Sequence, residues 1–281
     1  MRLVLLGSCV LVMTACGGRV PVARAPEAAP VAAVPVDLLA TPWRLGDGRA
    51  KRAQRIEVAA QLTSRVDSLV RMDSVRSELL VIWGDDASSS SRPIPVTVSH
   101  FAVRSGTDTT WHSPAGVTVP FTLEATPVRG AVPQLCAASA CAAASLAAAQ
   151  GWQESWLGLP TAMEPGTTWS DSTRYTVTRD SVPLMVTSIR HFAVREAFVR
   201  EGAVVLVIDR HSRQELTGEG RQFGEPLQIT GRGEGVMRME VALRNGAVLR
   251  GDGTSILTLQ LVGRRRTQDL VQESAITITA P

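Results

Sequence analysis

The amino-acid sequence predicts a mainly β (α+β) fold in which a curved antiparallel sheet or half-barrel is the central element. Three observations lead to this prediction. Apolar and polar side chains alternate with a period of two residues over several segments, as in half-buried strands. Asn245-Gly246 separates two such segments and favours a tight β-hairpin turn, because both turn residues must adopt positive φ. The pentapeptide His-Phe-Ala-Val-Arg occurs twice, at residues 100–104 and 191–195.

The alternation is clearest in three segments, residues 56–66, 117–125 and 236–243. Each carries its apolar side chains on one face: Ile56, Val58, Ala60, Leu62 and Val66 in the first, Val117, Val119, Phe121 and Leu123 in the second, and Met237, Met239, Val241 and Leu243 in the third. We expect a strand in each segment, with the apolar face toward a core. After the Asn-Gly turn we expect a return strand over 247–262 and a last strand near 268–279.

The repeated pentapeptide indicates a duplicated strand–turn–strand unit. Both copies follow a Thr/Ser-rich apolar strand, and both precede a turn and a further apolar strand. In this interpretation Phe101 and Val103 face the core, whereas His100 and Arg104 face outward. The two units then belong to two similar β halves of one fold.

Residues 133–158 break the β pattern and predict the helix that joins these halves. Within this segment, residues 142–149 are all alanine except Ser145 and Leu146. Alanine has the highest helix propensity and is depleted in strands. The β-rich domain is expected to span 51–281, with its halves at about 51–130 and 165–281. A sheet of about ten strands is too large to stay flat and should curl.

Residues 1–15 are interpreted as a signal peptide. Met1-Arg2 gives a short positive start, and the uncharged apolar run from Leu3 to Met13 is too short to span a bilayer. The run ends in Met13-Thr14-Ala15-Cys16, which resembles a lipobox, so Cys16 is the predicted lipidation site. Leu6-Gly7-Ser8-Cys9 is a competing match that leaves an apolar run of only about five residues. A plain secretory signal cleaved nearby is the other alternative.

Residues 16–50 are expected to form the lipidated cysteine and a disordered tether. The segment is rich in Pro, Ala and Gly and sustains no apolar period, so burial cannot offset the entropy lost on ordering. Two or three acyl chains on Cys16 would anchor the protein far more firmly than one chain does. By resemblance to lipoprotein sorting rules, Gly17 favours the outer membrane, and we expect a location in the cell envelope facing the periplasm.

Cys136 and Cys141 are the pair left for an oxidising compartment, and a local disulfide is expected between them. Their spacing does not suit disulfide geometry within a continuous helix, so bonded cysteines would bracket a turn or a helix start. Two buried free thiols are the alternative. A metal site would need further ligands, and no His, Asp or Glu lies nearby.

The sequence predicts no catalytic residue, no metal site and no cofactor. Nucleophile-elbow, zinc-protease, phosphate-loop and EF-hand patterns are all missing from it. The alternate glycines of Gly231-Arg-Gly-Glu-Gly235 lie between strands and indicate a bend or close sheet packing. Arg264-Arg265-Arg266 is interpreted as a solvated strand end or turn, because no aromatic residues accompany it as in a nucleic-acid site.

One alternative site involves the histidines. Asp209 and His211 lie on one face of a predicted strand, and with His100 or His191 they could form an acid–base or metal site. The simpler interpretation is a strand end with polar residues on its wet face.

Leu159-Pro160, followed by Pro165-Gly166-Thr167-Thr168-Trp169, resembles an uncharacterised family of bacterial envelope lipoproteins. The resemblance covers roughly residues 55–280 in layout, and it implies a strand that begins at the Trp after a Pro-Gly turn. Its layout is similar to half-barrel carriers of lipoproteins or lipids, an analogy between folds that does not establish function.

The function expected from these features is that of a membrane-anchored, non-enzymatic envelope lipoprotein that binds an apolar ligand or lipid on a curved sheet. An envelope interaction or scaffold protein is the first alternative. A hydrolase or metalloprotein that uses Asp209 and His211 is the second. The expected partners are the membrane, through Cys16, and an apolar ligand or an envelope protein, but no nucleic acid.

Overall fold

The computed structural model describes residues 43–44, 52–83, 94–106, 119–123, 129–131, 162–179, 182–222, 224–243 and 246–281. All of them belong to the unit Ala32–Pro281. The predicted signal peptide, the lipidation site Cys16, the cysteines Cys136 and Cys141, and the Ala-rich helix of 133–158 lie outside the described residues, as does most of the tether. In the described part of the chain, no helix is long and apolar enough to cross a membrane.

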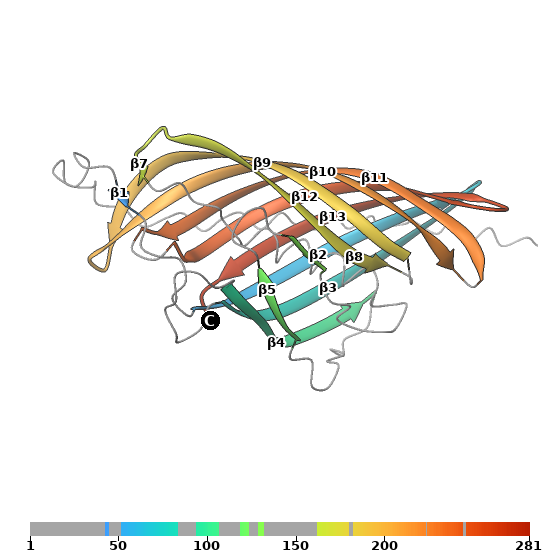
Figure 1. The fold of residues 1–281 in the computed structure, drawn as a ribbon, viewed down its shortest axis with the longest axis horizontal. Helices are drawn as coiled ribbons and strands as arrows, with labels where there is room; N and C mark the ends of the chain where they lie inside the picture. The colour runs from blue at the N-terminus through green and yellow to red at the C-terminus, as the bar shows by residue number, and fades with distance from the viewer. Residues whose placement is uncertain are drawn as a thin grey trace, which may run out of the picture. The chain divides into compact units, whose positions relative to one another are not determined.

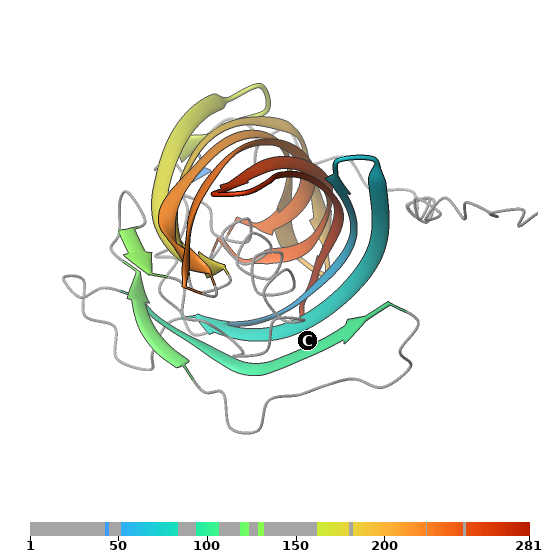
Figure 2. The same cartoon turned by 90° about the vertical axis from the view of Figure 1, so that its right-hand side faces the viewer.

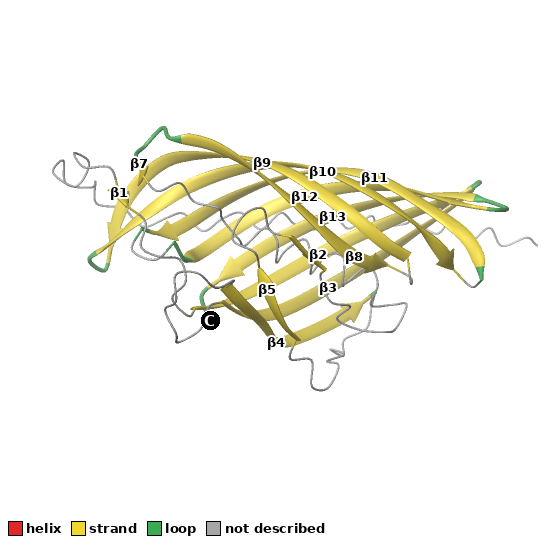
Figure 3. Cartoon of the chain, viewed as in Figure 1, coloured by secondary structure: helices red, strands yellow, loops and turns green. Residues whose placement is uncertain are grey.

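Every regular element of the described residues is a strand (Figures 1 and 3). The strands are β1 (Trp43–Arg44), β2 (Arg52–Val66), β3 (Leu69–Trp83), β4 (Ile94–Ser105), β5 (Val119–Leu123), β6 (Arg129–Ala131), β7 (Ala162–Met163), β8 (Thr168–Arg179), β9 (Val182–Arg200), β10 (Ala203–Gln222), β11 (Glu225–Ala242), β12 (Val248–Gly263) and β13 (Thr267–Thr279). β9 and β10, with 19 and 20 residues, are several times longer than the usual strand of about 5–6 residues.

Eleven strands form one sheet in the order β5-β4-β3-β2-β13-β12-β11-β10-β9-β8-β6, and β1 pairs with β7 in a second, two-stranded sheet. All neighbours in the large sheet are antiparallel except β6 and β8. The sheet curls strongly and stays open, with β5 and β6 at the ends of the strand order (Figure 2). The predicted curved antiparallel sheet is therefore confirmed.

The pairing of β2 with β13 joins the N-terminal and C-terminal strands into this single sheet. Ile276 lies opposite Val58, and Ile278 lies opposite Ile56. All four side chains are buried. Aliphatic cross-strand pairs of this kind stabilise a sheet beyond its backbone hydrogen bonds.

Burial alternates along the long strands as the sequence predicts. In β2, Ile56, Val58, Ala60 and Leu62 are buried, and in β11 the same holds for Met237, Met239 and Val241. We call the side of the sheet that carries these residues the buried face and the other side the exposed face. In the two pentapeptides, Phe101, Val103, Phe192 and Val194 are buried, whereas His100, His191 and Arg195 are exposed and Arg104 is half-buried. The predicted faces are confirmed for Phe101, Val103 and His100.

Two turns also match their predictions. β11 and β12 pair as a hairpin, and Gly246 between them has φ of 64°. Pro165 and Gly166 form a turn just before β8, in which the Gly166 amide donates a hydrogen bond to the Val194 carbonyl at 2.8 Å. β8 begins one residue before Trp169.

The glycines of β11 allow close packing on the buried face, as predicted. A Cβ atom added at Gly231 would lie 2.8 Å from the backbone oxygen of Thr258 and would also collide with the Leu259 side chain. Backbone atoms cannot move aside without disturbing the β11–β12 ladder. Gly231 is therefore required by its neighbours on β12.

We predict that Gly231→Ala lowers the free energy of unfolding by about 1–3 kcal/mol, the usual cost of overpacking a core. Gly263→Ala is the matched control, because its added Cβ would come no closer than 3.5 Å to another residue. The control should change stability by less than about 0.5 kcal/mol. Chemical denaturation measures both variants, and equal stabilities would contradict the packing assignment.

Candidate functional site

The buried face is apolar for most of its length but carries two arginines. Arg190 and Arg210 are each only 2% exposed. Other polar side chains share their burial, namely Gln54, Ser77, Thr173, Ser188, Ser212, Gln214, Gln272 and Ser274. Charged groups are seldom buried to this extent unless they are paired, so this part of the sheet is the candidate site.

Strand register gathers most of these side chains across β8, β9 and β10. One row runs from Asp171 through Arg190 to Ser212, and the next from Thr173 through Ser188 to Gln214. Since side chains in neighbouring rows lie on the same face, these six residues and Arg210 form one polar patch. The polar patch is bordered by the apolar side chains of Phe192, Val186 and Leu216.

A bidentate ion pair between Arg190 and Asp171 lies at the centre of the polar patch. Arg190 donates hydrogen bonds from Nε to Asp171 Oδ1 at 2.7 Å and from Nη2 to Asp171 Oδ2 at 2.5 Å. The side chain of Asp171 is 17% exposed. Bidentate pairing with a carboxylate is the geometry that best offsets the free-energy cost of removing a guanidinium from water. The burial of Arg190 thus depends on Asp171.

Aromatic rings pack beside this ion pair. The guanidinium carbon of Arg190 lies 5.4 Å from the centre of the Phe192 ring. Phe192 in turn stacks on Trp169, with ring centres 4.7 Å apart and planes inclined by 8°. A cation above an aromatic face adds electrostatic attraction and fixes the orientation of the guanidinium.

Ser188 provides a further polar group in the polar patch. Its side chain is 2% exposed, and its hydroxyl makes no hydrogen bond within the described part of the chain. Ser188 lies two residues from Arg190 on the same strand face. A hydroxyl can donate and accept, so Ser188 could bind a polar group of a ligand on this face.

Sequence reasoning missed Arg190, Arg210 and Asp171. A signal was present, because both arginines fall on the strand parity of buried residues. Arg190 lies between Ser188 and Phe192 in this alternation, and Arg210 lies between Ile208 and Ser212. A charged residue on the apolar parity of a long strand indicates a buried ion pair or a ligand contact.

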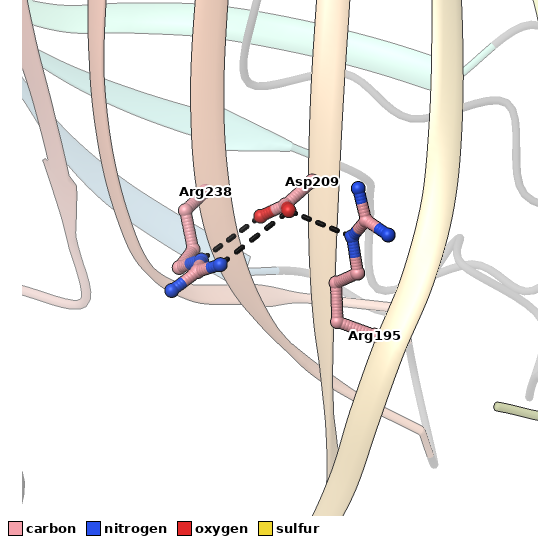
Figure 4. Close-up of polar contacts among 3 residues, drawn as sticks. All are labelled: Arg195, Asp209 and Arg238. Atoms are coloured by element: carbon pink, nitrogen blue, oxygen red, sulfur yellow. Dashed lines mark hydrogen bonds and ion pairs between the residues drawn. The ribbon is translucent and has the colours of Figure 1, made fainter. Parts of the chain in front are cut away.

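The exposed face carries the residues of the predicted alternative site. Asp209 on β10 accepts hydrogen bonds from Arg238 Nε at 2.9 Å and from Arg195 Nε at 2.8 Å (Figure 4). Arg238 is its direct cross-strand partner on β11. The register of β9 and β10 shifts between Val207 and Ile208, and Arg195 falls at this irregularity. Such bulges redirect side chains, and here Arg195 reaches Asp209.

These contacts fix the charge of Asp209. The hydrogen bond from Arg238 is the main cause that holds the pKa of the Asp209 carboxyl below its usual range, and Arg195 adds to it against the effect of burial. Asp209 in turn raises the pKa of Arg238. A carboxylate engaged by two guanidinium groups is suited to cross-linking three strands and poorly suited to accepting a proton in catalysis.

The structure brings together only part of the predicted histidine site. His211 lies opposite His191 in the register of β10 and β9, and the hydroxyl of Ser170 lies 2.7 Å from His191 Nδ1. His100 is on β4, far along the strand order from β10. No group of three His, Cys, Asp or Glu side chains that could hold a metal ion occurs among the described residues.

Comparisons with known proteins add little to this site. No protein-family model matches the chain, and no curated protein matches it. Among solved structures, the chain is similar to a DUF1329 family protein from Desulfovibrio piger, with 7% sequence identity over 83% of this chain and 87% of that one, and with a TM-score of 0.19. A similarity of this size carries no argument about family, lipidation or activity.

We predict that Asp209→Asn lowers the free energy of unfolding by about 1 kcal/mol at pH 7, as expected for a small network of partly exposed ion pairs. The pKa of Asp209 is lowered in the folded chain, so its contribution is complete above the pKa of about 3.9 in unfolded chains and is lost as the pH falls below it. The difference between the two proteins should therefore shrink below about pH 4.

Asp252→Asn is the control for this experiment. Asp252 contacts the guanidinium of Arg250 at 2.8 Å, and both side chains are 40% or more exposed. Asp252→Asn should lower the free energy of unfolding by no more than about 0.5 kcal/mol, less than half the effect of Asp209→Asn. Denaturation at several pH values measures both proteins, and a pH-independent difference for Asp209→Asn would contradict the assigned charge state.

Proposed function

We propose that the chain is a non-enzymatic, membrane-anchored protein of the cell envelope that binds a lipid on the buried face of its curved sheet. The observation that carries the proposal is the combination of one extensive apolar face with a small polar patch. A lipid has the same two parts, an apolar chain and a polar head group.

The apolar part of the face supports binding of an acyl chain. The core cluster draws on nine neighbouring strands of the large sheet, from β4 to β8 in the strand order. In the described part of the chain, Met163 of β7 in the two-stranded sheet also belongs to this cluster, and no helix packs on it. Burial of a lipid chain contributes about 0.8 kcal/mol per methylene group and needs no specific geometry.

The polar patch supports recognition of a head group. Arg190 is held by Asp171 and Phe192, so its orientation is fixed before a ligand arrives. Ser188 lies beside it with an unused hydroxyl within the described residues. Apolar sites typically place a few polar groups in this way to orient a ligand.

The membrane anchor in this proposal rests on the sequence. Met13-Thr14-Ala15-Cys16 resembles a lipobox, and Gly17 follows the cysteine. The apolar run before it has the length of a signal peptide. We propose lipidation at Cys16 and a position on the outer membrane facing the periplasm.

An interaction or scaffold protein is the second candidate, favoured by the strand order. β5 and β6 end the large sheet and lie close to each other without pairing in the described part of the chain. An extended segment of a partner could add to such an edge. The hydrolase alternative gains no support from the contacts of Asp209, which are with Arg195 and Arg238.

Photo-crosslinking of the full chain with a diazirine-labelled phospholipid tests the lipid site. We expect crosslinks at residues whose side chains are buried, such as Leu184, Leu257 and Ile276. The matched controls are apolar residues of the exposed face, Ile189 and Ile256, which should stay unlabelled in detergent solution. Ile256 and Leu257 are adjacent and lie on opposite faces, so the position of the label between them identifies the labelled face. Labelling confined to the exposed face, or none above background, would contradict the proposal.

The role of the polar patch is tested with a double variant. Arg190→Met together with Asp171→Leu removes both charges and keeps side chains of similar volume, a replacement that often preserves folding. We expect this variant to keep a cooperative unfolding transition and to lose its preference for phospholipid over a fatty alcohol carrying the same label. An unchanged preference for phospholipid over the fatty alcohol would show that the polar patch does not recognise the head group.

A further inference from the structure

The most exposed large apolar side chains of the described residues are gathered at one hairpin. Leu69 is 75% exposed, Met72 is 62% exposed and Val70 is 56% exposed. They follow the two-residue turn of Asp67 and Ser68, which joins β2 to β3. Single exposed apolar residues are common, but three within four positions form an apolar tip that needs an explanation.

This tip is apolar on both faces of the strand. Successive side chains of a strand point to opposite sides, so Leu69 lies on one face and Val70 and Met72 on the other. β4 pairs with β3 only from Val75 onward, so in the described part of the chain residues 69–73 have β2 on one side alone. A partner protein would cover one face, whereas a fluid apolar medium surrounds both.

The neighbouring hairpin adds positive charge. Arg264, Arg265 and Arg266 form the exposed turn between β12 and β13, and they make no ion pair within the described residues. Asp269 pairs with Arg65 in the register of β13 and β2, so both turns lie at the same end of the sheet (Figure 1). Val262, which is 38% exposed, stands beside the arginine turn.

The β2–β3 and β12–β13 hairpin ends together carry a positive charge. Five arginines, at positions 65, 71, 264, 265 and 266, outnumber three aspartates, at positions 67, 73 and 269. Arg71 contacts Asp73 at 2.9 Å, and the arginine turn remains available to solvent. An apolar tip beside free arginines fits a surface that is apolar inside and negatively charged outside.

We propose that the β2–β3 and β12–β13 turns form a docking surface for an anionic lipid bilayer. Leu69, Val70 and Met72 enter the boundary between head groups and acyl chains, and Arg264–Arg266 contact the lipid phosphates. Interfacial binding of this kind combines buried apolar area with attraction between basic residues and anionic lipids. The surface is separate from the buried face and does not depend on the lipid bound there.

Hydrogen–deuterium exchange of the full chain with vesicles tests this proposal. Vesicles of phosphatidylcholine alone are compared with vesicles that also contain phosphatidylglycerol. An anchor at Cys16 would hold the chain near both kinds of vesicle, so the comparison isolates the docking surface. We expect peptides covering residues 66–73 to be protected only on the anionic vesicles. The β9–β10 turn, Glu201-Gly202, lies at the opposite end of the sheet and should exchange equally on both.

Two variants separate the apolar and electrostatic parts. Leu69→Asp with Met72→Asp should abolish the protection, because the tip can no longer enter the bilayer. Arg264→Gln, Arg265→Gln and Arg266→Gln together should weaken binding roughly 100-fold, since each basic residue near an anionic surface contributes about a factor of five. All five substituted side chains are exposed, so folding should be preserved.

The proposal is overturned if residues 66–73 exchange equally with and without anionic vesicles, or if neutral vesicles protect them as well. It is also overturned if the arginine variant retains full protection. Crosslinking of the buried face is measured separately, so failure here would leave the proposed lipid site untouched.

Discussion

The strict alternation of buried and exposed side chains along very long strands is the constraint on which this fold depends. Strands of 12 to 20 residues must keep their register across the sheet, because a slip by one residue would turn every apolar side chain to solvent. Three irregularities in the described pairings shift the register locally without ending the pairing: between Leu80 and Val81, between Val207 and Ile208, and between Glu240 and Val241. Gly231 and Gly233 let β11 and β12 approach where a Cβ would collide.

The polar patch interrupts this otherwise apolar face with buried charged and polar side chains. Burial of a guanidinium is expensive, and pairing with a carboxylate compensates only when the geometry is good, as it is between Arg190 and Asp171. Replacement of a buried ion pair by hydrophobic residues of similar volume is often neutral for stability. In the proposed function this ion pair faces the polar group of the ligand, whereas Asp209 is engaged by two arginines that are largely exposed.

The alternation of apolar and polar side chains along the sequence predicted much of the sheet. Ile56, Val58, Met237 and Met239 alternate so regularly that their strands and faces follow from the sequence alone, and the hairpin at Gly246 follows from its turn chemistry. β3 was not predicted, because Leu69, Val70 and Met72 place apolar residues on both parities at its start. Their exposure at the hairpin tip accounts for the broken pattern.

The candidate site was predictable only in part, since its contacts join strands that are distant in sequence. The prediction that Asp209 and His211 share a face is consistent with their burial pattern, but Asp209 meets Arg195 and Arg238 through a bulge and a register that sequence spacing does not reveal. Asp171 and Arg190 are likewise brought together by the pairing of β8 with β9. The predicted helix, lipidation site and disulfide lie outside the described residues and stay predictions.

Native mass spectrometry of the full chain, released gently from its membrane, tests the central claim most directly. A covalently attached anchor survives collisional activation, whereas a lipid held on the buried face is ejected as a separate species. We expect one non-covalent lipid per chain, lost on activation and regained when phospholipid is added back. A chain that carries no releasable lipid and takes up none would contradict it.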